Sequence, residues 1–167
     1  MTNTELSAGR SAKRIAVPDE ARLRSPLKRP DYQDTFAIGA PGADAESAEQ
    51  WARRVFEAAP APVRMITRLG WLSFGAKLGP AGSPGHVAGW TIGQAEKDWI
   101  RLEVVWAVGL RAHLVLRPRT SSFALSTFVE YDRRAARFVW PGVMPVHWVI
   151  VRYLLGHAAK TFAGERA

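Results

Sequence analysis

The side chain best suited to chemistry is His147, which follows Pro145 at the start of a long apolar stretch. An imidazole titrates near neutral pH, so it could serve as a base, as a hydrogen-bond donor in a cavity, or as a pH-sensitive group. Polar side chains in a first helical turn more commonly bond to local backbone. We therefore expect His147 to donate to a carbonyl near Gly142 or Val143 and to fix the start of a helix.

Three further polar side chains, Arg101, Glu103 and His113, lie on two stretches of alternating apolar residues either side of Gly109. They fall opposite the apolar set, and antiparallel sheets commonly have one solvated face. We expect these three side chains to face solvent. The alternative is a polar cavity, in which they would supply an acid, a base and an electrophile.

Several kinds of chemistry lack the residues they need. The chain has no cysteine, which excludes disulfides, thiolate metal ligands and cysteine nucleophiles. Its four histidines lack metal-ligand spacing, so no metal or other cofactor is expected. The glycine-rich stretch 79–85 lacks the lysine of a phosphate-binding loop, and no G-x-S-x-G motif occurs. The catalytic residues, if any, are unknown from this pattern, which favours a protein that is not an enzyme.

The net charge of +8 raises the question of nucleic-acid binding. Residues 1–29 hold seven basic and three acidic side chains, half of that excess, and the rest is spread along the chain. No nucleic-acid-binding signature accompanies the charge, so nucleic acid is not an expected partner. We interpret residues 1–29 as a flexible basic leader and 30–167 as the folded domain.

The start of the chain lacks the long apolar run of a secretory signal, which with the absence of cysteine favours a cytoplasmic protein. The most apolar stretch, 138–155, contains two prolines and Arg152. A membrane span is therefore not expected there, although a helix lying at a membrane surface is an alternative.

Hydrophobic periodicity predicts the elements that would position these residues. A strand is expected at 31–38, followed by a helix from 47 to 59, a second helix after Pro60 and a loop at 75–85. The period then falls to two, which predicts strands at 87–94, 100–108, 110–117 and 122–131. Residues 136–140 could add a short strand or lead into a helix that starts at Pro145 and runs to Phe162.

Short connections between successive strands favour antiparallel hairpins, and the terminal helix has the apolar surface to cover them. The fold class predicted is α+β. It is a helix-grip arrangement, in which a curved antiparallel sheet has two short helices after its first strand and a long C-terminal helix across its concave face.

Four runs in this order resemble a known group: DYQDTF at 31–36, WARRVFEAAPAPVR at 51–64, STFVEYD at 126–132 and PVHWVIVRYLL at 145–155. The chain is similar to the helix-grip fold of the Bet v 1-like (SRPBCC) superfamily, which includes START lipid-transfer domains and polyketide cyclases. Within it, the chain resembles the bacterial family called domain of unknown function 2867. The resemblance implies a cavity under the terminal helix that often holds an apolar ligand, and implies no shared catalytic residues.

The leading hypothesis is a protein that binds an apolar or aromatic small molecule between sheet and C-terminal helix. One alternative is a cyclase-like or dehydratase-like enzyme using His147, or His113 with Glu103. Another is a module for dimerisation or for contact with a membrane surface; the oligomeric state is left open. Seven tryptophans offer bulky walls with an N–H each. The residues expected to line the cavity are Trp90, Leu102, Trp106, Leu114, His147, Trp148, Ile150 and Leu154.

Overall fold

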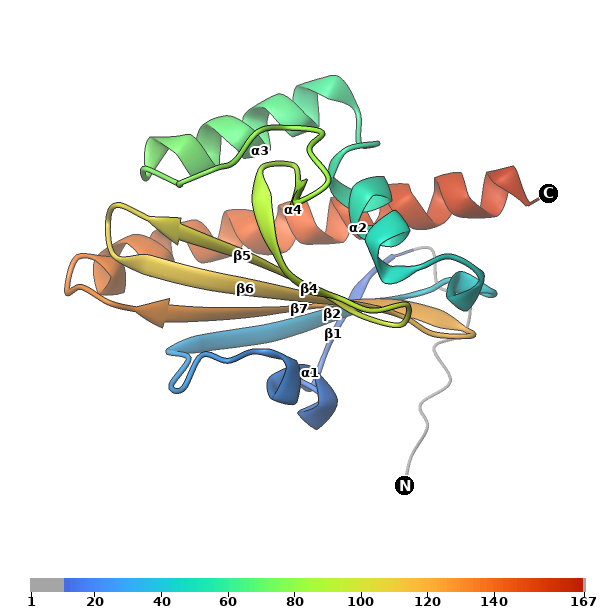
Figure 1. The fold of residues 1–167 in the computed structure, drawn as a ribbon, viewed down its shortest axis with the longest axis horizontal. Helices are drawn as coiled ribbons and strands as arrows, with labels where there is room; N and C mark the ends of the chain where they lie inside the picture. The colour runs from blue at the N-terminus through green and yellow to red at the C-terminus, as the bar shows by residue number, and fades with distance from the viewer. Residues whose placement is uncertain (1–10, 167) are drawn as a thin grey trace.

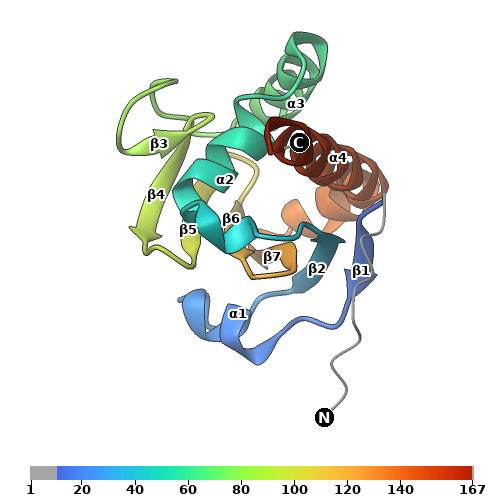
Figure 2. The same ribbon diagram turned by 90° about the vertical axis from the view of Figure 1, so that its right-hand side faces the viewer.

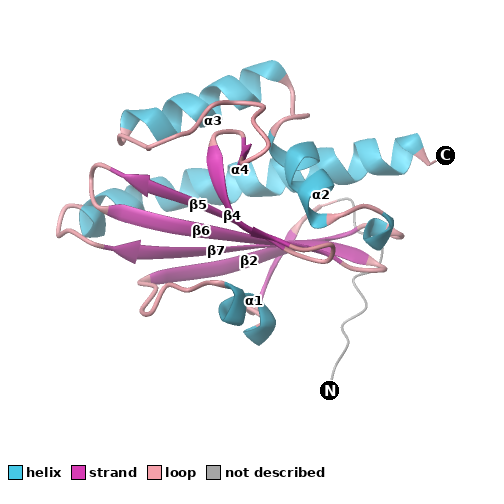
Figure 3. Ribbon diagram, in the orientation of Figure 1, coloured by secondary structure: helices cyan, strands magenta, loops and turns pink. Residues whose placement is uncertain are grey.

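The computed structural model describes residues 11–166 of the chain, as a seven-stranded sheet with helices on both faces (Figures 1 and 3). Helices α2, α3 and α4 lie on one side of this sheet, and α1 lies on the other (Figure 1). In chain order the elements are β1 (Lys13–Ile15), α1 (Asp19–Arg24), β2 (Tyr32–Gly39), the 3-10 turn η1 (Ala43–Ala45), α2 (Ala48–Phe56), α3 (Ala61–Ser73), β3 (His86–Val87), β4 (Trp90–Ala95), β5 (Ile100–Trp106), β6 (Leu110–Pro118), β7 (Ser122–Tyr131) and α4 (Ala136–Glu165).

The strands are ordered β1-β2-β7-β6-β5-β4-β3, and every neighbouring pair is antiparallel. Strands β3 to β7 form successive hairpins, while β2 pairs with β7 from the other end of the chain. Figure 2 shows the sheet curving around an interior that α2 and α4 close. The predicted α+β class, the antiparallel sheet and the long C-terminal helix are confirmed, in a layout compatible with a helix grip.

Helix α2 begins where the sequence predicts. The Ser47 hydroxyl accepts from the Gln50 backbone N–H while the Gln50 side chain accepts from the Ser47 N–H, so both orphan donors are satisfied. Trp51 then enters the core, stacked on Phe123 with ring centroids 4.5 Å apart. Its indole N–H donates to the Ala43 carbonyl. This anchors α2 between the sheet and α4.

Helix α4 begins at Ala136, so the predicted start at Pro145 is wrong, as is the alternative strand at 136–140. Pro141 and Pro145 lie inside the helix, where each removes one backbone donor. Ala136 and Trp140 explain the early start because both are buried, one turn apart on the face toward the sheet. Their burial outweighs the loss of two backbone hydrogen bonds.

The N-terminal segment is structured from residue 11 onward, in contrast to the flexible leader predicted for 1–29. Strand β1 pairs with β2, and α1 covers the convex face of the sheet. Ala21 is buried there with Val115 and Phe128. The Glu20 carboxylate accepts from Arg117, which fixes α1 by an ion pair as well as by apolar contact. Residues 1–10 lie outside the described part of the chain.

Two smaller features also bear on the predictions. The strand expected at 87–94 is divided into β3 and β4 by Ala88 and Gly89, which both adopt positive φ angles and form a tight turn. In the described part of the chain, α4 is the one helix long and apolar enough to cross a membrane. Because Leu155 and Ala158 of this helix are buried in the fold, the structure is compatible with a soluble protein.

Candidate functional site: a cavity and the Asp34–His147 pair

A cavity of about 430 Å³ lies between the sheet and helices α3 and α4. This volume is in the range of pockets that hold small organic molecules. Its walls come from the concave face of β4 to β7, from the inner side of α3 and from the first half of α4. The polar side chains in the wall, besides the indoles, are Thr67, Thr127 and His147.

Six of the eight residues predicted for the cavity line it, namely Trp90, Trp106, Leu114, His147, Ile150 and Leu154. The other two do not, so their placement in the wall was wrong. Leu102 is fully buried in the packed core. Trp148 turns toward β2, where its indole N–H donates to the Tyr32 hydroxyl at 2.7 Å and Arg14 lies over its ring. That the six bind a ligand stays a prediction.

His147 forms a hydrogen-bonded pair with the Asp34 carboxylate, a residue that was not predicted from the sequence. The distance between His147 Nε2 and Asp34 Oδ2 is 3.1 Å, and the Asp34 side chain is completely buried. The expected bond from His147 to a backbone carbonyl at the helix start is wrong. With α4 beginning at Ala136, His147 lies in the body of the helix, where its side chain points across to β2.

A chain of hydrogen bonds supports this pair. Trp148 donates to the Tyr32 hydroxyl, and Tyr32 in turn donates to Asp34 Oδ2 at 2.5 Å. Thr127 Oγ1 lies 3.4 Å from His147 Nε2. The second carboxylate oxygen, Asp34 Oδ1, is buried with no hydrogen-bond partner in the described residues. Trp148 and Tyr32 therefore orient one carboxylate, and that carboxylate orients one imidazole.

Electrostatics favour an ionised Asp34. Burial would raise the pKa of Asp34, but the hydrogen bond from His147, together with the hydrogen bond from Tyr32 and the nearby Thr127 hydroxyl, outweighs burial and holds the pKa of Asp34 below its usual value. Burial, followed by the hydrogen bond to Asp34, raises the pKa of the Tyr32 hydroxyl. At neutral pH Asp34 is thus a carboxylate, and the Tyr32 phenol that donates to it is neutral.

The sheet register brings these residues together. Asp34 on β2 pairs with Thr127 on β7, and Thr127 pairs with Leu114 on β6, so the three form one row on the concave face. A signal for Asp34 was present in the sequence. It occupies the apolar phase of its strand, between Tyr32 and Phe36, where a carboxylate must be buried.

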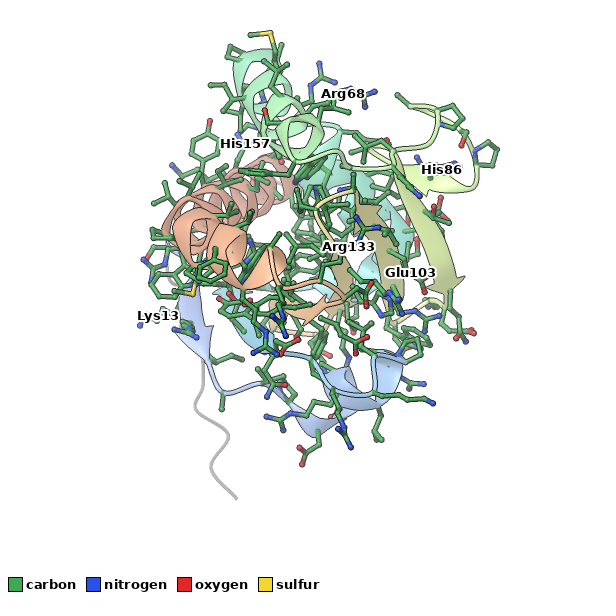
Figure 4. The ribbon with its side chains drawn as sticks, turned by 90° about the vertical axis from the view of Figure 1, so that its left-hand side faces the viewer. Lys13, Arg68, His86, Glu103, Arg133 and His157 are labelled. Atoms are coloured by element: carbon green, nitrogen blue, oxygen red, sulfur yellow. The ribbon has the colours of Figure 1, made fainter. Side chains whose placement is uncertain are left out.

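The second group of candidates lies on the opposite face of the sheet. Glu103 pairs in register with His113, and Figure 4 shows Glu103 far from α4. The Arg101 guanidinium bonds to Glu103 at 2.7 Å. His113 is buried rather than solvated, because α1 covers it and Ser25 Oγ lies 3.1 Å from its Nδ1. Burial lowers the pKa of His113 to about 4. None of the three lines the cavity.

Within residues 11–166, no three histidine or acidic side chains come together as a metal-binding group. Comparisons with protein-family models, with curated proteins and with solved structures found no match to this chain. Its function is therefore inferred from the cavity and from the residues around it.

Proposed function

We propose that this chain is a cytoplasmic helix-grip protein of the Bet v 1-like superfamily, in the family called domain of unknown function 2867. It binds an apolar or aromatic small molecule between the sheet and α4. The observation that supports this function most directly is the cavity of about 430 Å³ beneath α3 and α4.

The walls suit a ligand that is mostly hydrocarbon or aromatic. Trp90 and Trp106 meet edge to face with centroids 5.6 Å apart, and Trp71 meets Trp90 in the same way at 5.5 Å. Such indoles offer flat faces to an aromatic ring. A ligand that removes about 200 Å² of apolar surface from water gains about 5 kcal/mol before the costs of association. Apolar burial is therefore the main favourable contribution to binding, and the affinity depends on how much of it the costs of association offset.

The test is titration with N-phenyl-1-naphthylamine, a neutral apolar dye whose fluorescence rises when it leaves water. We expect saturable binding to the purified protein. Ala112→Leu should weaken binding about tenfold or more, because Ala112 lies in the wall and a larger side chain takes ligand volume. Ala95→Leu is the matched control, since Ala95 is exposed on β4.

Two results would contradict this function. One is the absence of saturable dye binding to the folded wild-type protein. The other is equal affinity for the dye in the Ala112→Leu and Ala95→Leu variants, which would place the dye elsewhere. Native mass spectrometry of freshly purified protein provides a second readout, in which a retained small molecule adds mass that unfolding removes.

A second candidate function is docking to an anionic membrane surface. Ile66 of α3 and Val146 of α4 both line the cavity and are more than half exposed, so the cavity opens between these helices. We call the exposed apolar residues near this opening the mouth patch: Ile66, Leu69, Val146 and Val149. Helix α3 has no acidic residue, and α4 has one, Glu165 at its far end. The mouth patch therefore has no acidic neighbour on these two helices that would repel an anionic surface.

Vesicle sedimentation tests this candidate. The protein should pellet with vesicles that contain phosphatidylserine and stay in solution with phosphatidylcholine alone. Val149→Glu should release it, while Leu23→Glu, an exposed apolar position on α1, should not. Equal sedimentation of both variants would exclude the mouth patch as the surface that contacts the membrane. A dimer that dissociates on Val149→Glu would assign the patch to a second copy of this chain instead.

A further inference from the structure

We propose that His147, oriented by Asp34, is a general base that removes a proton from the molecule bound in the cavity. This inference rests on the proposed binding function and extends it from ligand binding to catalysis. The substrate class is a small aromatic or apolar molecule with a weakly acidic C–H bond beside an electron-withdrawing group such as a carbonyl. The base stands in the wall of the cavity where that molecule would lie.

The geometry assigns different roles to the two nitrogens of His147. Nε2 faces the Asp34 carboxylate at 3.1 Å, and because an ionised carboxylate can only accept, Nε2 is assigned the proton of this hydrogen bond. Nδ1 has no hydrogen-bond partner among the described residues, so in this tautomer its lone pair is free to accept a proton. A carboxylate that fixes the tautomer of an imidazole is the arrangement used for general-base catalysis.

Asp34 contributes as a positioning residue. It is 1% exposed, so water screens its charge little, and its ionised form stabilises the imidazolium that proton transfer creates. The other groups that face the imidazole are Tyr32, Thr127 and Trp140. Tyr32 holds the carboxylate by its hydrogen bond, Thr127 Oγ1 lies 3.4 Å from Nε2, and the centroid of the Trp140 ring lies 5.5 Å from that of the imidazole. The cation Arg14 lies farther out, over the Trp148 ring.

Stability alone is a poor reason for this arrangement. A buried carboxylate paired with a polar side chain commonly contributes no more to stability than apolar residues of the same volume, because the groups lose their hydration. Phe36, two residues along the same strand, shows that an apolar side chain fits this face of β2. The pair lies instead at the cavity, where an oriented base can take a proton from a bound molecule.

The probe for this activity is 5-nitrobenzisoxazole, a flat aromatic molecule with one acidic C–H. His147 Nδ1 takes the proton from C3, and the electron pair of that C–H bond forms the third bond of the nitrile. The N–O bond breaks, and its electrons leave on the phenolate oxygen. The imidazolium then returns its proton to water. The step needs no oxidant or cofactor, and the coloured phenolate reports its rate.

We expect turnover per binding site about a hundredfold or more above free imidazole at equal concentration. His147→Gln should reduce the rate to background while the probe still quenches tryptophan fluorescence. His157→Gln is the matched control, a histidine on the outer side of α4 away from the cavity (Figure 4), and it should leave the rate unchanged. Asp34→Asn should slow the reaction and move the midpoint of the pH–rate profile to lower pH.

A protein that binds the probe and shows no His147-dependent turnover overturns this inference and leaves the binding function intact. A protein that binds neither this probe nor the naphthylamine dye overturns both. If the variants do not fold, nitrogen NMR of the wild-type protein decides. A His147 tautomer with its proton on Nδ1, and not on Nε2, would contradict the assignment.

Discussion

Acid should destabilise this protein through one buried histidine. His113 lies on β6 beneath α1, 4% exposed, with Ser25 Oγ 3.1 Å from its Nδ1. Burial lowers the pKa of His113 to about 4, and the nearby Glu103 carboxylate offsets only part of this effect. In the unfolded chain the same imidazole titrates near 6.5. Between these two values the unfolded state binds a proton that the folded state does not.

The sign and size of the effect follow from linkage. Well above pH 6.5 neither state binds the proton, so His113 does not change the free energy of unfolding there. As the pH falls below 6.5 the unfolded state gains the proton first, and folding stability decreases until the folded-state value near 4 is passed. The full loss is about 3 kcal/mol, of which about 2 kcal/mol has occurred by about pH 5.

Urea unfolding followed by tryptophan fluorescence, at about pH 7.5 and about pH 5, measures this loss. His113→Gln removes the titrating group and keeps a side chain that can bond to Ser25. The wild-type protein should lose about 2 kcal/mol more than this variant over the interval. His157→Gln serves as the control and should behave as wild type. Equal losses in wild type and His113→Gln would refute the reasoning.

Three further stability changes can be checked with the same unfolding assay. Trp51→Ala should cost about 3–5 kcal/mol, since it empties a fully buried site and removes the stack on Phe123; a cost below 1 kcal/mol would contradict that packing. Ser47→Ala should cost about 1 kcal/mol through loss of the capping box with Gln50, whereas Ser73→Ala, outside any cap, should cost little. Ala21→Asp should cost about 2 kcal/mol or more by placing a carboxylate against apolar side chains, and an unchanged stability would mean that α1 is not docked.

The sequence predicted the strands from β4 to β7 because their alternation is strong and their connections are short. The errors arose where tertiary packing outweighed local signals. Pro141 and Pro145 suggested a helix boundary, yet burial of Ala136 and Trp140 carries α4 through both of them. The polar, basic N-terminal segment suggested disorder, yet Ala21 finds an apolar site on the far face of the sheet.

The cavity could be predicted in outline and its polar centre could not. Trp106, Leu114 and Ile150 lie on apolar faces that must meet in any packing of this helix on this sheet. The Asp34–His147 pair depends instead on which strand neighbours β7 and on the rotation of α4. Both are set by long-range contacts that spacing along the chain does not report.

The pairing of β2 with β7 has a consequence during protein synthesis. Thr127, the β7 partner of Asp34, lies 93 residues after it. A ribosome that adds about 5–20 residues per second needs on the order of 5–19 s to cover this interval. During that time Phe36 and Ile38, which are buried in the finished fold, have no β7 strand beside them. The nascent chain therefore carries an apolar strand with an open edge, and it acquires its cavity only after β7 and α4 have both been synthesised.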